Sequence, residues 1–392
     1  MTDYNSLFDK GVDRRGTGSY KWDSEPGVLP LWVADMDFAT APEVVEALQK
    51  RVEGGAFGYT LVGEDYYEAV MGWFARRHGW NIARESIMYT SGVVPAISAI
   101  IKALASPGDK VIVQTPVYNC FFSSIRNNGC EVSENPLIYT GDSYVMDFDD
   151  LAAKASDPRA KILLLCNPAN PAGRVWTRAE LERLADICLR NDVVVVSDEI
   201  HCELVYPGYR YIPYGTLGEE YVGNSVTCVS PSKAFNTAGL QIASIITPNE
   251  SFRRRIDRAI NINEVCDVNP FGVVGTVAAY NRGELWLTRL IGYLKANYDM
   301  MASYCRENLP DLPICRLEGT YLVWMNIEAL GIDAAALEEI LLHREKLWLN
   351  AGDMYGDKRF IRWNIACPRT RLAEALRRFT RAIGNIMELS DD

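Results

Sequence analysis

The sequence predicts an α/β fold in which helices cover both faces of a mostly parallel sheet, followed by a smaller α/β domain. From about residue 86, short apolar strands alternate with amphipathic helices, and this alternation is typical of strand-helix-strand units. Residues 193–196 are four consecutive valines, as expected of a strand buried on both faces of a parallel sheet. Beyond residue 286, two further strands alternate with helices.

We expect three parts along the chain. Residues 1–41 are rich in glycine, proline, tryptophan and aspartate, and they are predicted to form an irregular N-terminal arm that packs with the small domain. Residues 42–285 are predicted to form the large domain, starting with a helix at Pro42. Residues 286–392 are predicted to form the small C-terminal domain.

The large domain begins its strand and helix alternation with a strand at 87–90, a helix at 93–105 and a strand at 110–114. Another strand at 161–166 leads into the turn 167–173.

After this turn, Thr177 and Glu180 have the spacing of a capping box, which starts the next helix. The later elements are expected to be helices at 252–262, 334–344 and 371–387, one long bent helix at 273–305, and strands at 320–327 and 360–365.

Bulk properties exclude several classes of function. The chain has 392 residues and a net charge of -11, which argues against nucleic acid as a partner. Its ten cysteines are scattered without a Cys-x-x-Cys pair, which favours reduced thiols and the cytoplasm. We expect no membrane span, because no window approaches about 18 apolar residues, and no metal site, because no cluster has ligand spacing.

Lys233 is the candidate catalytic group. It lies in the turn 230–236, Ser-Pro-Ser-Lys-Ala-Phe-Asn, after an apolar strand. Taken alone such a lysine is usually a solvated one. Three other segments, at 167–173, at 193–201 and around Arg362, supply the further groups that a pyridoxal phosphate site requires, and ligands of α/β sheets bind at the carboxyl ends of strands.

Two residues follow the valine strand. The carboxylate of Asp198 is either a helix cap or turn residue, or the group that keeps the pyridine nitrogen of the cofactor protonated. His201 either hydrogen-bonds near the ring oxygen of the cofactor or makes a structural polar contact.

Three other segments offer cofactor contacts. Asn170 is either a turn residue or a donor to the phenolate oxygen of the cofactor. The backbone N–H groups of Gly92, Val93 and Val94 begin a helix and can bind a phosphate. Tyr118 either stacks on the pyridine ring or packs in the core.

Arg362 interrupts an apolar strand near the C-terminus. A buried arginine requires a partner. That partner is either the α-carboxylate of an amino acid, bound by two hydrogen bonds, or a structural Asp or Glu.

The spacing of Asn170, Asp198, Ser230-x-x-Lys233 and Arg362 resembles that of the fold type I pyridoxal-phosphate enzymes, the aspartate aminotransferase superfamily, over nearly the whole chain. Within this superfamily, the segments at 15–23, 30–38, 197–201 and 232–236 resemble the MalY/PatB branch of cystathionine β-lyase-like C–S lyases. The resemblance implies a mostly parallel central sheet of seven strands.

The resemblance also implies roles for individual residues. Lys233 would bind the cofactor covalently, Tyr118 would stack on its ring, and Ser230 would bind its phosphate. Ala34 would bind substrate. Tyr59 would reach the phosphate of the neighbouring subunit, so the protein is expected to be a homodimer with shared active sites, and Lys233, Asp198 and Tyr59 are the predicted catalytic residues.

One position departs from the family pattern. Most aminotransferases of this fold carry an arginine eight residues after the lysine, where this sequence has Gln241. This change removes a charge from the phosphate site and makes an ordinary aminotransferase less expected.

The predicted reaction is α,β-elimination from L-cystathionine, L-cysteine or a related S-substituted cysteine, which yields pyruvate, ammonia and a thiol. Two alternatives stay open at this point. One is an aminotransferase acting on an L-amino acid, which would use the same residues. The other is a regulatory or binding protein that keeps the fold.

Overall fold

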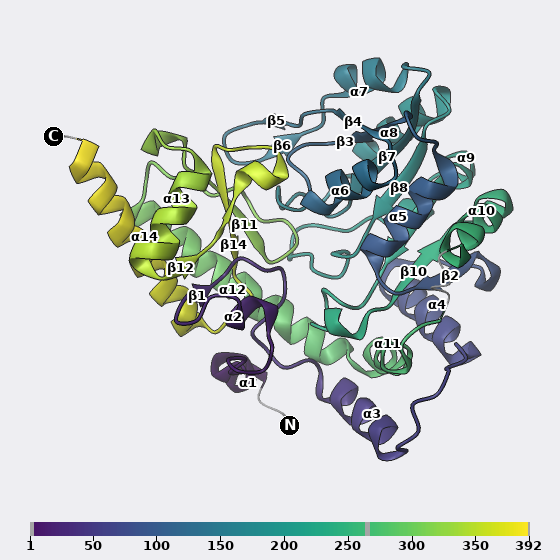
Figure 1. Ribbon diagram of the computed structural model, residues 1–392, viewed down its shortest axis with the longest axis horizontal. Coiled ribbons are helices and arrows are strands. Elements are labelled where there is room, and N and C mark those ends of the chain that lie inside the picture. The colour runs from purple at the N-terminus through teal and green to yellow at the C-terminus, as the bar shows by residue number, and fades with distance from the viewer. Residues whose placement is uncertain (1–3, 263–266, 391–392) are drawn as a thin grey trace.

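The computed structural model describes residues 4–262 and 267–390. Its largest sheet has seven strands in the order β2-β10-β9-β8-β7-β3-β4, which confirms the predicted mostly parallel sheet (Figure 1). The seven strands are β2 (Ile87–Thr90), β3 (Lys110–Val113), β4 (Glu131–Glu134), β7 (Ala160–Cys166), β8 (Val194–Asp198), β9 (Ser225–Val229) and β10 (Ala243–Ile246).

Strand β10 is antiparallel to both of its neighbours, and the other neighbouring pairs are parallel. It follows β9 without an intervening α-helix, and a parallel return usually needs such a crossover. The parallel register pairs Cys166 with Asp198 and Asp198 with Cys228. The carboxyl ends of β7, β8 and β9 therefore lie level at one edge.

Helices cover both faces of this sheet because successive side chains of a strand point to opposite faces. Val111 and Val113 pack with α5 (Val93–Leu104), α6 (Asn119–Asn127) and α10 (Glu250–Asn261), whereas Ile112 packs with α7 (Phe148–Ala155) and α8 (Arg178–Arg190). The predicted capping box begins α8: the Glu180 amide donates to Thr177 Oγ1, and the Thr177 amide donates to Glu180 Oε2.

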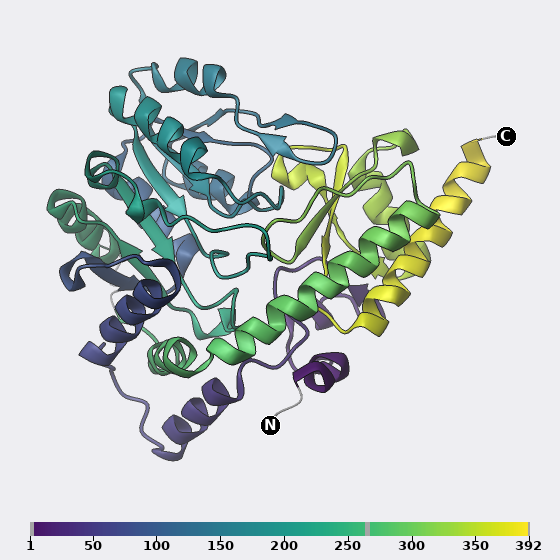
Figure 2. The ribbon, with the colours of Figure 1, turned by 180° about the vertical axis from the view of Figure 1, so that it is seen from behind.

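The C-terminal part contains a three-stranded antiparallel sheet, β11-β14-β13. Helix α12 packs against α14 beside it (Figure 2). The elements here are α12 (Glu284–Asn308), β11 (Leu322–Asn326), α13 (Ala334–Ile340), β12 (Leu347–Trp348), β13 (Asn350–Ala351), β14 (Phe360–Asn364) and α14 (Arg369–Ser390).

The N-terminal segment contacts this C-terminal part. Strand β1 (Leu29–Pro30) pairs in parallel with β12, and α1 (Tyr4–Lys10) packs against α12. Helix α2 (Tyr20–Asp23) lies between them in sequence. The division into an arm, a large domain and a small domain at residues 41 and 285 remains a prediction.

The remaining elements complete the large part. Helices α3 (Pro42–Glu53) and α4 (Glu64–His78) pack on α11 (Pro270–Arg282). Strands β5 (Ile138–Tyr139) and β6 (Tyr144–Val145) form a hairpin, and α9 (Glu219–Gly223) is short.

The expected single bent helix at 273–305 is wrong, because α11 and α12 are separate helices divided at Gly283. A Cβ atom at this position would lie 2.5 Å from Phe235 Cε1 and 2.7 Å from the carbonyl oxygen of Ala279. Glycine is a poor helix former, and here its missing side chain permits a close approach that ends α11.

Candidate active site

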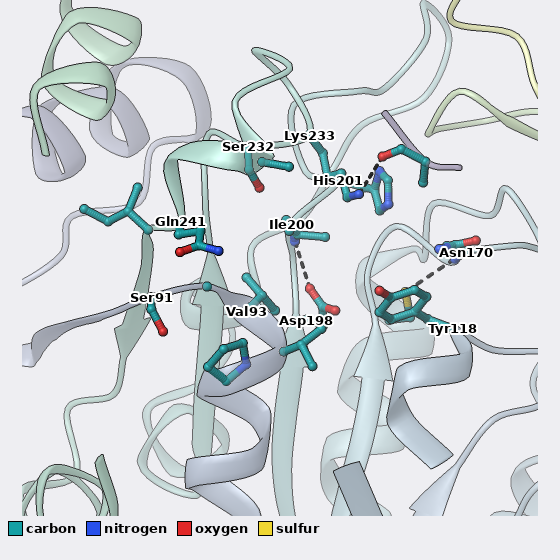
Figure 3. A pocket seen from close by; sticks show the side chains of 17 residues that line it. Ser91, Val93, Tyr118, Asn170, Asp198, Ile200, His201, Ser232, Lys233 and Gln241 are labelled. Carbon is teal, nitrogen blue, oxygen red and sulfur yellow. Dashed lines mark hydrogen bonds between the residues drawn. The ribbon is translucent and has the colours of Figure 1, made fainter. Parts of the chain in front are cut away.

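A pocket opens at the carboxyl edge of the seven-stranded sheet (Figure 3). Most of the predicted site residues line it. These are Ala34, Gly92, Val93, Val94, Tyr118, Asn170, Asp198, His201 and Lys233. Ser230, Arg362 and Tyr59 are not among the lining residues.

Lys233 comes from the turn after β9 and points into the pocket (Figure 3). Its Nζ atom donates a hydrogen bond of 2.6 Å to the carbonyl oxygen of Ala34. Burial lowers the pKa of Lys233 to about 8, and the positive charge of Arg362 acts in the same direction, while Asp35 and Asp198 oppose it. This amine therefore has a neutral, proton-accepting fraction near neutral pH.

Asp198 ends β8 and is buried. Its Oδ1 atom accepts a hydrogen bond of 3.1 Å from the amide of Ile200. Burial raises the pKa of Asp198 to about 7, against the opposing effects of that amide and of Lys233. A carboxyl group with this pKa can share a proton with a basic ring nitrogen.

His201 lies in the same pocket and is buried. Its Nδ1 atom has no hydrogen-bond partner among the residues that the structure describes. Burial and the positive charges of Lys233 and Arg362 lower the pKa of His201, so the ring is neutral. A buried polar atom without a partner is costly, and a ligand in the pocket could satisfy it.

Arg362 is contributed by β14 and lies beside Asn170, which follows β7. Arg362 donates from Nη1 to Asn170 Oδ1 at 3.2 Å and from Nη2 to the Trp32 carbonyl at 2.8 Å. Its guanidinium carbon lies 4.6 Å from the ring centre of Tyr355.

Arg362 is 3% exposed. Its Nε atom has no partner, and within 4–262 and 267–390 no carboxylate forms an ion pair with it. The sequence left two partners open for Arg362, and the structural one is excluded within the described chain, because no Asp or Glu there pairs with it. The arginine is available for the carboxylate of a ligand.

Tyr118 precedes α6 and lines the pocket. Burial raises the pKa of its hydroxyl, as do Cys120 and Asp198, while Arg362 opposes the rise. The phenol is therefore neutral, and its ring forms one wall of the pocket opposite Gln241 and Ser91 (Figure 3).

The opposite end of the pocket is formed by the start of α5. Gly92 has a φ of 151°, and α5 has no side-chain cap among the described residues. The first N–H groups of a helix lack partners within the helix. Gly92, Val93 and Val94 line this end of the pocket, and the phosphate contact expected of their amides stays a prediction.

Ser230 was expected to bind the cofactor phosphate, but it does not line the pocket. Its hydroxyl donates to the carbonyl of Ile242 at 2.7 Å and accepts from the amide of Ser232 at 3.2 Å. Of the two serines in this turn, Ser232 lines the pocket. Ser230 shapes the turn, and a phosphate contact from it stays a prediction.

Tyr59 lies on the surface. The residue is 98% exposed, and it does not line the pocket of its own chain. Its predicted contact with a neighbouring subunit stays a prediction.

Sequence reasoning missed Ser91, Ser232 and Tyr321. Ser91 and Ser232 line the pocket, and both stand beside predicted residues, so proximity in the chain was a usable signal. Tyr321 donates to the Ala34 carbonyl at 2.9 Å. No local pattern marks a tyrosine of this kind, because its partner is 287 positions away.

Ala34 reaches the site because the backbone on both sides of it is hydrogen-bonded to other parts of the chain. Asn236, in the lysine turn, bonds the amide and the carbonyl of Met36 and the carbonyl of Phe38. Asn364, in β14, donates to the carbonyls of Val33 and Asp35.

Two features are absent from the described part of the chain. No group of three or more His, Cys, Asp or Glu residues there could hold a metal ion. No helix there is long and apolar enough to cross a membrane.

Comparison with known proteins gives matches over nearly the whole chain. PatB of Bacillus subtilis (strain 168), named a cystathionine β-lyase, is 39% identical over 384 residues, with 96% of this chain and 99% of PatB covered. The structure of cystalysin from Treponema denticola, which contains pyridoxal 5'-phosphate, superposes with a TM-score of 0.94 at 34% identity, covering 96% of this chain and 98% of cystalysin.

The pyridoxal-phosphate-bound C–S lyase of Staphylococcus hominis superposes with a TM-score of 0.89 at 31% identity, covering 96% of this chain and 98% of that lyase. The family model for aminotransferase class I and II matches residues 26–379. The chain therefore belongs to the aminotransferase class I and II family.

Proposed function

We propose that this protein is a pyridoxal-phosphate-dependent C–S β-lyase that converts L-cystathionine, L-cysteine or a related S-substituted cysteine to pyruvate, ammonia and a thiol. The observation that carries this proposal is Arg362, a buried arginine without a carboxylate partner in the described chain, beside a pocket that contains Lys233. Relatives named cystathionine β-lyase and C–S lyase support the reaction class.

The pocket fits the cofactor in its donor set. The neutral His201, with its Nδ1 atom unpartnered, and Asn170 suit the ring oxygen, and Asp198 suits the ring nitrogen. Tyr118 suits the ring face, and the first amides of α5 suit the phosphate. When bound, this cofactor withdraws electrons from the α-carbon of an amino acid, so that the α-proton becomes removable.

Individual residues of the chain have separate roles in the proposed reaction. Arg362 binds the substrate carboxylate with its free donors, and Asn170 holds the guanidinium in place. Lys233, in its neutral form, takes the α-proton at Nζ. The thiolate then leaves the β-carbon, and water converts the remaining three-carbon fragment to pyruvate and ammonia.

The carbonyl of Ala34 has two donors, Lys233 Nζ and Tyr321 Oη. It therefore holds the amine of Lys233 at the pocket wall whenever that amine is not bonded to cofactor.

The test is a substrate panel assayed for pyruvate release without any keto acid. Cystathionine, cysteine and S-alkyl cysteines are expected to give pyruvate and thiol in equal amounts. Turnover that requires a keto-acid acceptor, with no thiol released, would instead establish an aminotransferase. The Lys233→Ala variant serves as the control, because it measures how much pyruvate is released without Lys233.

We further propose a homodimer in which Tyr59 serves the partner's site. Val52, Phe57, Tyr59 and Leu61 are 52%, 57%, 98% and 89% exposed. They lie close together in the chain, in α3 and the following loop. An exposed apolar patch of this kind favours contact with another protein surface.

Complementation tests the shared site. Chains with Lys233→Ala and chains with Tyr59→Phe are mixed under conditions that exchange subunits. One site of each mixed dimer then carries neither change, so activity is expected to recover to about half of that of a wild-type dimer. Absence of recovery, with exchange shown by native mass spectrometry, would mean that Tyr59 serves its own chain.

Two further proposals concern organisation and location. The boundary at residue 285 is supported by the separate sheets that the chain forms before and after α12, and the N-terminal arm by the contacts of β1 and α1 with the C-terminal part. A cytoplasmic location is supported by nine free cysteines in the described residues, eight of them buried, because reduced thiols persist in that compartment.

A further inference from the structure

The carbonyl oxygen of Ala34 accepts hydrogen bonds from two side chains. Lys233 Nζ donates to it at 2.6 Å and Tyr321 Oη at 2.9 Å, and Figure 3 shows the bond from Lys233 inside the pocket. A carbonyl oxygen has two lone pairs. Lys233 and Tyr321 therefore share one acceptor, and both of its lone pairs are in use.

The position of this carbonyl does not depend on Tyr321. Asn364 donates from Nδ2 to the carbonyls of Val33 and Asp35, on either side of Ala34. Because the neighbouring peptide groups are held in this way, the Tyr321 hydroxyl adds little to the anchoring of the segment. What it adds is a second donor on the oxygen that the lysine uses.

Tyr321 follows a residue with an unusual backbone. Thr320 has a φ of 71° and is fully buried, and a β-branched residue is an outlier in this left-handed region. Its amide donates to the carbonyl of Leu204, its carbonyl accepts from Tyr206 Oη, and its Oγ1 atom accepts from the amide of Leu322. Backbone strain persists where surrounding contacts hold it, and it clusters at functional sites. A strained turn thus fixes the direction of the Tyr321 side chain.

The Tyr321 hydroxyl is a permanent donor. Tyr321 is buried, and burial together with Asp35 raises the pKa of its hydroxyl, while Arg362 opposes the rise. The phenol therefore keeps its proton, which carries a partial positive charge and points at the Ala34 oxygen. A positively charged Lys233 donates to the same oxygen, so the two donors compete for it and their like charges disfavour the ammonium form.

We propose that Tyr321 is a positioning residue for Lys233: its hydroxyl occupies one lone pair of the Ala34 carbonyl and so limits how tightly that oxygen holds the ammonium form of the lysine. The amine must leave this oxygen to reach a ligand or an α-proton, and a tighter hold would slow both steps. This inference deepens the proposed function, and its meaning for turnover rests on that function.

The experiment measures the titration of Lys233 in the cofactor-free protein by competitive acylation and peptide mass spectrometry, so it needs no enzyme activity. Tyr321→Phe removes the hydroxyl and keeps the ring. Its midpoint is expected to lie about half a pH unit or more above that of the wild type, roughly a threefold change in the ratio of ammonium to amine. Replacing Tyr321 by 3-fluorotyrosine makes the hydroxyl a stronger donor and is expected to lower the midpoint.

Two further variants separate this effect from a loss of structure. Tyr298→Phe is the matched control, because the Tyr298 hydroxyl also donates to a backbone carbonyl, that of Cys315 at 3.3 Å, and does not line the pocket. Its midpoint is expected to equal that of the wild type. Asn364→Ala is the reference for a loosened N-terminal segment and is expected to speed limited proteolysis there, whereas Tyr321→Phe should be cleaved at the wild-type rate.

A wild-type or lower midpoint in Tyr321→Phe would overturn the assignment. A raised midpoint with cleavage as fast as in Asn364→Ala would also overturn it, because a loosened segment lets water reach the lysine without any role for the hydroxyl. If Tyr321→Phe does not fold, the 3-fluorotyrosine protein decides, and a midpoint that is not lowered refutes the inference. If the wild type releases no pyruvate from the substrate panel, the proposed function fails, whereas an unshifted Tyr321→Phe midpoint removes this inference alone.

Discussion

The Nζ atom of Lys233 lies 2.6 Å from the carbonyl oxygen of Ala34, although the two residues are 199 positions apart. This hydrogen bond joins the lysine turn to the N-terminal segment. Because Tyr321 donates to the same carbonyl, three distant parts of the chain meet at one oxygen atom. The environment of the lysine therefore depends on the correct placement of the N-terminal segment.

The first prediction concerns the titration of Lys233. In the cofactor-free protein, its reactivity with an acylating reagent is expected to rise with a midpoint near pH 8, because burial lowers its pKa to about 8. Exposed lysines usually have a pKa of about 10.4. Competitive labelling with peptide mass spectrometry measures the midpoint, and a value above 10 would contradict the expectation.

Replacing Arg362 by glutamine is expected to raise the pKa of Lys233, because the guanidinium lowers it. The same labelling experiment measures the change. Arg359→Gln is the matched control, since Arg359 is paired with Asp357 and partly exposed. An equal shift in both variants would show that the effect is not specific to the pocket.

The third prediction concerns the pH dependence of stability. Burial raises the pKa of Asp198 from 3.8 to about 7 in the folded chain, so the folded state holds its proton more tightly. The stability that this group contributes is complete below about pH 4 and is lost as the pH rises through 7. Asp198→Asn removes the ionisation and is expected to abolish this loss.

Denaturant unfolding of the cofactor-free proteins at pH 5 and pH 8 measures the difference. For each protein, the unfolding free energy at pH 5 is subtracted from that at pH 8. This difference is expected to be at least about 1 kcal/mol more positive for Asp198→Asn than for wild type. Asp149→Asn, at a fully exposed side chain, should gain nothing. A gain that is the same in both variants would rule out the buried carboxyl as its source.

The fourth prediction separates two kinetic roles. Arg362→Ala is expected to raise KM for the sulfur amino acid roughly 10-fold or more, because a charged hydrogen-bonded contact is lost. Asp198→Ala is expected to lower kcat with a smaller effect on KM, because the proton on the ring nitrogen is lost. Steady-state kinetics measure both constants, and identical defects in the two variants would refute this division.

The fifth prediction concerns Asn236, which makes three hydrogen bonds of 2.8 to 3.0 Å to Met36 and Phe38. Its φ is 54°. Asn236→Ala loses the hydrogen bonds and strains the backbone, and is expected to cost about 2 to 4 kcal/mol of unfolding free energy. Asn236→Gly loses the same bonds without the strain.

Urea unfolding and limited proteolysis of the N-terminal segment measure the effect of both Asn236 variants. The alanine and the glycine variant are both expected to speed cleavage of this segment. Unchanged cleavage in both would mean that the segment is held by its other contacts, such as those from Asn364.

Much of the fold follows from local pattern. The valine run became β8, and Thr177 with Glu180 formed the capping box of α8, because periodicity and caps act over a few neighbouring residues. The strand-end positions of Asp198, Asn170 and Lys233 also follow from sequence, since parallel strands bring their carboxyl ends to one edge.

Tertiary structure decided what local pattern leaves open. The break at Gly283 depends on Phe235 and Ala279. Ser232 lines the pocket in place of Ser230 because the Ser230 hydroxyl is bonded to Ile242. Within the described residues no carboxylate pairs with Arg362, and this depends on the segments packed around β14. A short stretch of sequence specifies its own hydrogen bonds and apolar face. Which side chain enters a pocket and which charge stays unpaired are determined by distant segments that only the folded chain brings together.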